Sequence, residues 1–176
     1  MRVSRFIRFV MASLMTAAGG VVIAAGPAHA VTVAQTCVGT EVTTFNPPLT
    51  FTPQPVTITV NGVYPTCTDP GAFNGSYAET FTLTASCTTL FDAGTATRTV
   101  VWGTPTAEPT TFDYNVVTNA VGGQVVTTNS GVLTDGRYTP GSAQQVITLV
   151  TPNILQCLSS GVASLTGPTV LTITQP

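Results

Sequence analysis

Residues 77–87 read YAETFTLTASC. Within this stretch apolar and hydroxyl side chains alternate strictly, with Phe81, Leu83, Ala85 and Cys87 interleaved between Thr80, Thr82, Thr84 and Ser86. A period of two is typical of a β-strand that presents one face to a core and the other to water. We therefore expect a central strand at residues 80–87, with the sulfur of Cys87 pointing inward and bonded across the core.

Short segments of similar character recur along the chain, separated by Gly, Pro and Asn-Gly signals. They predict further strands at residues 41–45, 56–60, 95–102, 112–116, 125–128, 132–134, 144–150 and 169–174. Asn129-Ser130-Gly131 is predicted to be the turn of a hairpin, and residues 154–164 could form one helical turn. Because threonine is abundant and suits a pleated surface, the composition also favours an all-β fold. The segments and the turn signals between them predict about 8–10 short antiparallel strands.

The first thirty residues have the features of a secretory signal peptide. Arg2, Arg5 and Arg8 precede a modest apolar run, and Ala28-His29-Ala30 is a small-x-small cleavage pattern. We expect residues 1–30 to be removed and residues 31–176 to form a single domain. The expected product is secreted, has no membrane anchor after cleavage, and is a monomer.

The charge of the expected mature chain excludes several partner classes. Residues 31–176 contain two arginines, no lysine and seven acidic side chains, which gives a formal charge of −5. A surface without a basic footprint argues against nucleic acid and against anionic lipid as partners.

All four cysteines lie in the exported part, as expected for disulfides in an oxidising compartment. The spacing favours Cys37 with Cys67, which lie symmetrically about a proline-rich connection, and Cys87 with Cys157, which would join two core strands. The rival pairing is Cys67 with Cys87 and Cys37 with Cys157. No C-x-x-C pair is present to suggest zinc.

The order Cys87, Trp102, Cys157 resembles the cysteine–tryptophan–cysteine pattern of immunoglobulin-like β-sandwiches. Two departures are Leu155, where that family usually has a tyrosine, and the additional Cys37–Cys67 pair. With Cys37-Val38-Gly39-Thr40 near its start, a proline-broken segment and glycine-rich hairpins, the chain also resembles small secreted actinobacterial all-β proteins. That group has no assigned activity, so the resemblance implies only an extracellular location and an immunoglobulin-like sandwich.

The residues available for catalysis are few. The single histidine, His29, lies in the leader, so the mature chain has no histidine for a catalytic triad or for a metal site. A hydrolase that works with two carboxylates is still possible, and its candidate acids are Glu79, Asp92, Glu108 and Asp113. Glu79 shares the alternation of Phe81 and could face inward. Asp69, Asp92 and Asp135 lack the spacing of a calcium loop, so no metal, cofactor or catalytic residue is assigned.

We expect a non-enzymatic protein that binds an extracellular protein or polysaccharide. Aromatic side chains that could provide stacking surfaces are Tyr64, Tyr77, Trp102, Tyr114 and Tyr138, although Trp102 and Tyr114 have the alternation of core residues. Two alternatives are a surface-coat protein that assembles through sheet edges and an extracellular glycan hydrolase that uses the carboxylates.

Overall fold

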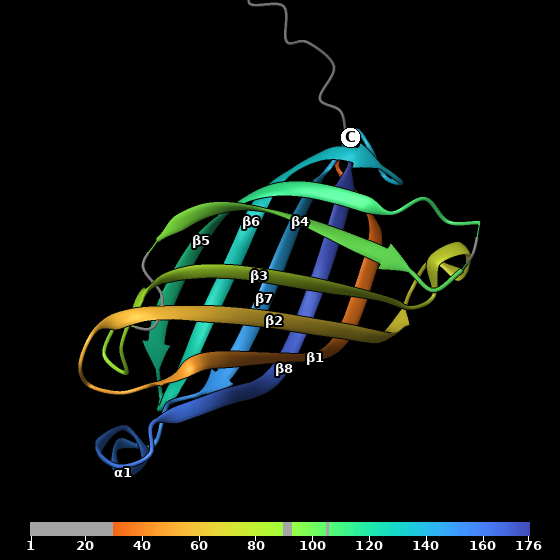
Figure 1. Ribbon diagram of the computed structural model, residues 1–176. Coiled ribbons are helices and arrows are strands. Elements are labelled where there is room, and N and C mark those ends of the chain that lie inside the picture. The colour runs from red at the N-terminus through yellow and green to blue at the C-terminus, as the bar shows by residue number, and fades with distance from the viewer. Residues whose placement is uncertain (1–29, 90–92, 105) are drawn as a thin grey trace, which may run out of the picture.

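The computed structural model describes residues 30–89, 93–104 and 106–176. Within these ranges eight antiparallel strands follow one another around a closed barrel (Figure 1). The elements are β1 (Thr32–Leu49), β2 (Gln54–Cys67), the 3₁₀ turn η1 (Pro70–Ala72), β3 (Gly75–Ala85), β4 (Gly94–Trp102), β5 (Thr110–Val121), β6 (Gln124–Gly136), β7 (Ser142–Val150), the short helix α1 (Ile154–Leu158) and β8 (Val162–Gln175).

The all-β prediction is confirmed, but the architecture is a barrel and not the expected immunoglobulin-like sandwich of two sheets. The 18-residue strand β1 pairs with β2 on one side and with β8 on the other, which joins the first strand to the last. Alternating apolar residues give each strand one inward face in both architectures, so the pattern alone does not distinguish them. The wall formed by β1–β4 crosses in front of the wall formed by β5–β8 (Figure 1).

Several predicted strands are longer than expected because turn signals lie inside them. The predicted hairpin turn at Asn129-Ser130-Gly131 is wrong, since β6 runs through it without interruption. Gly131 is required there by close packing: a Cβ at this position would lie 1.7 Å from the Asp113 carbonyl oxygen of β5. Asn61-Gly62 likewise lies within β2, where the missing side chain of Gly62 leaves room for the ring of Tyr77.

Two disulfide bonds are present, as expected for an exported chain. They join Cys37 to Cys67 and Cys87 to Cys157, the two pairs that the spacing favours. Cys37 and Cys67 face each other across β1 and β2. The second bond does not join two core strands: Cys87 lies just after the end of β3, and Cys157 lies in α1. The Cys87–Cys157 bond therefore ties the loop after β3 to the helix that precedes β8.

The two ends of the barrel differ in character. At the end that carries η1, Ala72, Trp102 and Tyr138 are buried and close the interior. At the end that carries α1, three side chains of that helix, Ile154, Leu155 and Leu158, are exposed.

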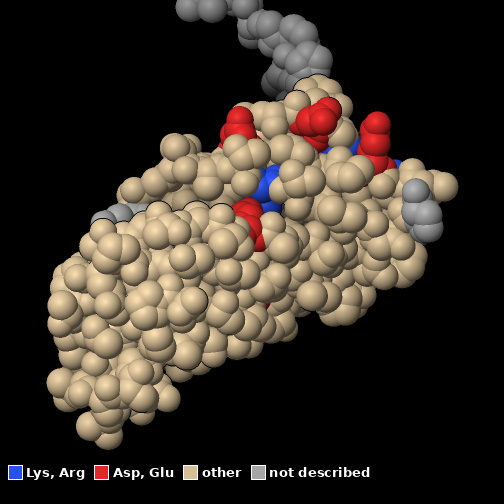
Figure 2. Space-filling model, in the orientation of Figure 1, with Lys and Arg blue, Asp and Glu red and all other residues tan. Residues whose placement is uncertain are grey.

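Charged side chains are also distributed unevenly between the two ends of the barrel. The described connections at the α1 end, residues 50–53, 86–89, 93, 122–123 and 151–161, contain no charged side chain. Acidic atoms gather towards the opposite end in Figure 2. None of the described helices is long and apolar enough to cross a membrane.

Candidate functional site

The wall of the barrel is incompletely bonded between β3 and β4. These two strands pair at Gly75 with Trp102 and at Ser76 with Val101, at the η1 end. Beyond those positions, no further pairing joins the described residues of β3 and β4. Every other pair of neighbouring strands is joined over a longer register.

This unpaired stretch explains the exposure of side chains that the sequence predicts to be buried. Phe81 and Leu83 are 40% and 38% exposed, although they alternate in phase with the buried Tyr77 and Ala85 of the same strand. Their inward direction therefore follows the prediction, but the space that they face is open to solvent. The prediction that they pack in a closed core is wrong because β4 does not cover them.

A cavity of about 520 Å³ lies at this opening. We call it the lateral cavity, and its lining is Glu79, Thr80, Phe81 and Leu83 of β3, Gly94, Thr95, Ala96 and Thr97 of β4, and Tyr114 and Val116 of β5. Its volume lies within the range of about 300–1,000 Å³ that is typical of sites for small ligands. Figure 2 shows charged atoms of both signs in a hollow on this otherwise largely uncharged face of the molecule.

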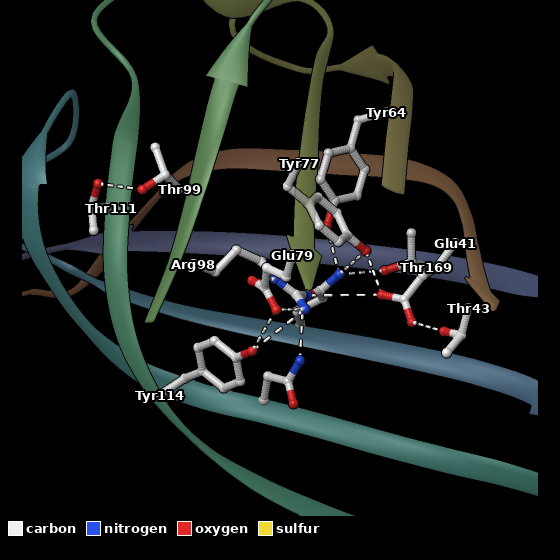
Figure 3. Close-up of polar contacts among 12 residues, drawn as sticks. Glu41, Thr43, Tyr64, Tyr77, Glu79, Arg98, Thr99, Thr111, Tyr114 and Thr169 are labelled. Atoms are coloured by element: carbon white, nitrogen blue, oxygen red, sulfur yellow. Dashed lines mark hydrogen bonds and ion pairs between the residues drawn. The ribbon is translucent and has the colours of Figure 1, made fainter. Parts of the chain in front are cut away.

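Behind Glu79, which lines the lateral cavity, lies a buried guanidinium group. Arg98 of β4 is 3% exposed. Its Nε and Nη2 atoms donate to the two carboxylate oxygens of Glu79 on β3, at 2.5 and 2.9 Å. Its Cζ atom lies 4.1 Å from the ring centroid of Tyr77 and 5.2 Å from that of Tyr114, an arrangement visible in Figure 3. The ion pair and two aromatic faces thus compensate for removing this cation from water.

Arg98 also connects the cavity to polar groups deeper in the barrel. Its Nη1 donates to Oε1 of Gln145 on β7 and lies 3.8 Å from Oε2 of Glu41 on β1. Glu41 accepts a hydrogen bond of 2.6 Å from the hydroxyl of Tyr77. We call the set of Glu41, Tyr77, Glu79, Arg98, Tyr114 and Gln145 the interior polar cluster. Its members come from β1, β3, β4, β5 and β7, so it links strands from both walls.

The environment of the interior polar cluster shifts several pKa values. Burial raises the pKa of Glu41 above its ordinary value, and the nearby Arg98 offsets this only in part. Burial raises the pKa of Tyr114 to about 12, and that of Tyr77 still further. Burial alone would lower the pKa of Arg98, but its hydrogen bonds to Glu79 and the charge of that carboxylate raise it overall. At neutral pH the tyrosines are therefore protonated and Arg98 is charged.

The four candidate acids of the carboxylate hypothesis do not gather at one site. Glu79 lies inside the barrel, as its alternation predicts. Asp113 is exposed on β5 and accepts a hydrogen bond from Thr97, while Glu108 is exposed in the connection after β4. Asp92 lies outside the described residues. The acid that approaches Glu79 is instead Glu41, through their shared contact with Arg98.

The five aromatic residues proposed as stacking surfaces do not form a surface. Tyr64, Tyr77, Trp102, Tyr114 and Tyr138 are all buried in the barrel. Among them Tyr114 borders the lateral cavity, where its hydroxyl lies 3.1 Å from Oε2 of Glu79. A flat aromatic platform for polysaccharide is therefore not formed by these residues.

In the described part of the chain, no three potential metal ligands among His, Cys, Asp and Glu lie together. Asp69, one of the acids considered for calcium, is instead paired with Arg137 at 2.6 Å and accepts a hydrogen bond of 2.7 Å from Tyr138. This contact lowers the pKa of Asp69, chiefly through the hydrogen bond from Arg137 and then that from Tyr138. Asp69 therefore holds the connections at the η1 end together.

Sequence reasoning missed Glu41, Arg98 and Gln145 as members of one site, although a signal for each was present. Arg98 alternates with Val100 and Trp102, Glu41 with Phe45, and Gln145 with Ile147, so each falls on the buried face of its strand. Charged and amide side chains on the apolar parity of three strands indicate a polar layer inside the fold.

Comparison with known proteins identifies no relative. No protein-family model, no curated protein and no solved structure matches this chain. Inferences about function therefore come from the geometry of the lateral cavity and of the interior polar cluster.

Proposed function

We propose that this chain is a secreted, non-enzymatic binding protein that holds a small, largely apolar molecule in the lateral cavity. The observation that carries the proposal is the exposure of Phe81 and Leu83 on the inward face of β3, beside a stretch of β4 that does not pair with it. Eight-stranded barrels have interiors of a size that side chains fill or that one small ligand occupies. Here the η1 end and the polar layer are filled, and the space beside β3 is not.

The lining of the cavity indicates the character of the molecule. Phe81, Leu83, Ala96 and Val116 offer apolar contact, while Glu79 and Tyr114 provide polar groups at the inner wall. A mostly apolar pocket with a few fixed polar groups is the usual form of a small-molecule site. The two disulfides and the leader-like residues 1–30 support a function outside the cytoplasm.

A carboxylate hydrolase is less well supported. A pair of catalytic carboxyl groups must flank the bond that is cleaved, but Glu41 is not among the residues that line the lateral cavity. Both oxygens of Glu79 accept hydrogen bonds from Arg98, so this carboxylate is already engaged. A substrate in the cavity would therefore meet one engaged carboxylate instead of an acid and a base.

A surface-coat protein that assembles through sheet edges is also less well supported. Strands within a closed barrel have no free edges. Among the described residues, unpaired edges occur between β3 and β4, where they face each other across the lateral cavity. A monomer that binds a small molecule fits this arrangement better than a strand-by-strand polymer.

Binding of the neutral fluorescent dye Nile red tests the proposed function. We expect its fluorescence to rise with the unmodified protein, and Ala96→Trp to weaken the binding by at least about tenfold because the indole fills the cavity mouth. The matched control is Ala78→Trp, which places the same side chain on the outer face of β3. Absence of dye binding to the unmodified protein, or equal loss in both variants, would contradict the proposal.

A further inference from the structure

Asn129 is a buried polar residue on the strand next to the lining of the lateral cavity. It lies in β6 and is 2% exposed. It faces Val116 of β5 across the sheet, and Val116 lines the cavity. Residues directly opposite each other in antiparallel strands present their side chains on the same face. The amide of Asn129 therefore points into the barrel behind Val116. Asn129 is not itself among the residues that line the cavity, but it lies one strand beyond them.

The orientation of this amide follows from a chain of hydrogen bonds that starts at Arg98. A guanidinium group can only donate, so the group of Gln145 that meets Arg98 must be its carbonyl oxygen. The Nε2 atom of Gln145 then donates towards the hydroxyls of Tyr64 and Thr169, both at 2.9 Å. Because Oε1 of Gln145 is an acceptor, Asn129 approaches it with Nδ2, at 3.4 Å.

This arrangement leaves the Oδ1 atom of Asn129 without a hydrogen-bond donor among the described residues. A buried carbonyl oxygen without a donor is unfavourable and uncommon in folded proteins. Rotating the amide would place Oδ1 against Oε1 of Gln145, which would bring two acceptors together. The unmet acceptor is therefore a fixed property of the site.

The charges near Asn129 limit what can supply the missing donor. Glu79 and Arg98 neutralise each other, and the Nε and Nη2 donors of Arg98 are taken up by Glu79. An anionic head group would meet the Glu79 carboxylate, and a cationic one would approach the guanidinium of Arg98. A neutral hydroxyl avoids both costs and donates one hydrogen bond.

We infer that Asn129 selects ligands whose buried end carries a neutral hydroxyl, so that the lateral cavity binds apolar alcohols in preference to ethers, hydrocarbons or fatty acids. The inference rests on the proposed function and specifies its ligand class. In the complex the hydroxyl donates to Oδ1 of Asn129, and the hydrocarbon part contacts Phe81, Leu83 and Val116.

Displacement of Nile red by matched probes tests this assignment. 1-Decanol and 1-methoxydecane share a ten-carbon chain and an oxygen, but only the alcohol can donate. We expect 1-decanol to displace the dye from the unmodified protein at about a tenfold lower concentration than the ether, and decanoate at neutral pH to be the weakest of the three. In Asn129→Leu the preference for alcohol over ether should fall to about that given by the partitioning of the two probes into an apolar solvent.

The possible outcomes separate the inference from the proposed function. Equal displacement by alcohol and ether in the unmodified protein, after correction for partitioning, would overturn the inference while binding itself stands; this outcome is also expected if a trapped water already satisfies Asn129. Strongest displacement by decanoate would overturn it in favour of Arg98 as the recognition group.

A preference for alcohol over ether that persists in folded Asn129→Leu, checked by circular dichroism, would show that the hydroxyl binds elsewhere and would overturn the inference. No displacement by any probe together with no dye binding would reject the proposed function itself. The comparison of probes on the unmodified protein decides the inference even if the variant does not fold.

Discussion

The junction of β1 with β8 and the junction of β3 with β4 are held together in different ways. β1 and β8 pair from Thr32 with Gln175 to Leu49 with Val162, through two irregularities. β3 and β4 are bonded at the η1 end, and further along they are linked by the side chains of Glu79 and Arg98. The long ladder of backbone hydrogen bonds gives a closed wall, whereas the side-chain link leaves space beside it. An opening in a closed barrel can therefore be maintained by one ion pair that replaces several backbone hydrogen bonds.

Hydrogen exchange should show the largest difference between the two junctions. Amides in residues 78–83 and 94–100 that do not bond β2 or β5 lack strand partners, so we expect opening free energies close to zero. Amides that bond β1 to β8 should approach the global free energy of unfolding, about 5–15 kcal/mol for a domain of this kind. Strong protection of the amides in these two ranges that do not bond β2 or β5 would show that the two strands pair in solution and that the opening is closed.

The link between Glu79 and Arg98 should be the next most sensitive point. Arg98→Met keeps much of the side-chain length but leaves the partly buried Glu79 and the buried Glu41 without their cation. We therefore expect a loss of about 3 kcal/mol in the free energy of unfolding, measured by urea denaturation. The double variant Arg98→Met/Glu79→Leu should recover part of this loss because it removes the uncompensated charge. A single variant as stable as the unmodified protein would show that the ion pair does not hold the junction.

Replacing one leucine by alanine at each junction should give a smaller difference in stability. Leu171 of β8 is 1% exposed and lies between β1 and β7. Leu171→Ala should therefore destabilise the protein by about 2–5 kcal/mol. Leu83→Ala removes the same atoms from the mouth of the lateral cavity and should cost about 1 kcal/mol or less, while weakening Nile red binding. Equal destabilisation by both variants in chemical denaturation would indicate that Leu83 is packed as a core residue.

The smallest expected effects concern pH and have opposite signs at two carboxyl groups. The pKa of Glu41 is raised in the folded state, so the folded chain holds this proton more tightly than the unfolded chain, and stability falls as the pH rises from about 4.5 through the folded pKa. Glu41→Gln should remove this fall and gain relative to the unmodified protein as the pH rises.

Asp69 provides the control of opposite sign. Its folded pKa is lowered, so its contribution is present above its ordinary value of 3.8 and is lost as the pH falls through the folded pKa. Asp69→Asn should therefore be most destabilising near neutral pH. Melting temperatures of both variants between pH 3 and pH 8 would check the two signs. We expect each variant to differ from the unmodified protein by about 1 kcal/mol or less in the free energy of unfolding. The same sign for both would mean that burial does not dominate at Glu41.

Local patterns in the sequence predicted much of this fold. Alternation correctly placed Glu79, Trp102 and Tyr114 on inward faces, because the side-chain period of a strand depends on its own backbone. Closure of the barrel depends on which strands pair over long sequence distances, and the alternation of each strand is the same in a sandwich. The immunoglobulin-like layout was inferred from the order of Cys87, Trp102 and Cys157. Cys157 lies in the helix α1 and not in a strand, so the disulfide does not join two sheets.

The site was harder to predict than the fold. Asn129 was interpreted as a turn residue because Asn and Gly favour turns, whereas Gly131 is required by a close contact with β5 that only the folded sheet reveals. The alternation along their strands places Glu41 and Gln145 on buried faces. Alternation does not show which side chains they contact, because those partners lie on other strands. Phe81 and Leu83 had the signature of core residues, and their exposure depends on pairing that β4 does not provide.

The arrangement of the interior polar cluster behind the lateral cavity also determines which positions of this protein can change over evolution. Substitution of Arg98, Gln145 or Tyr77 leaves a neighbour without its hydrogen bond, so these positions tolerate little variation. Phe81, Leu83 and Ala96 border open space and support no polar partner, so their size can vary without a large loss of stability. New specificities can therefore evolve, or be engineered, at the mouth while the centre of the barrel stays constant.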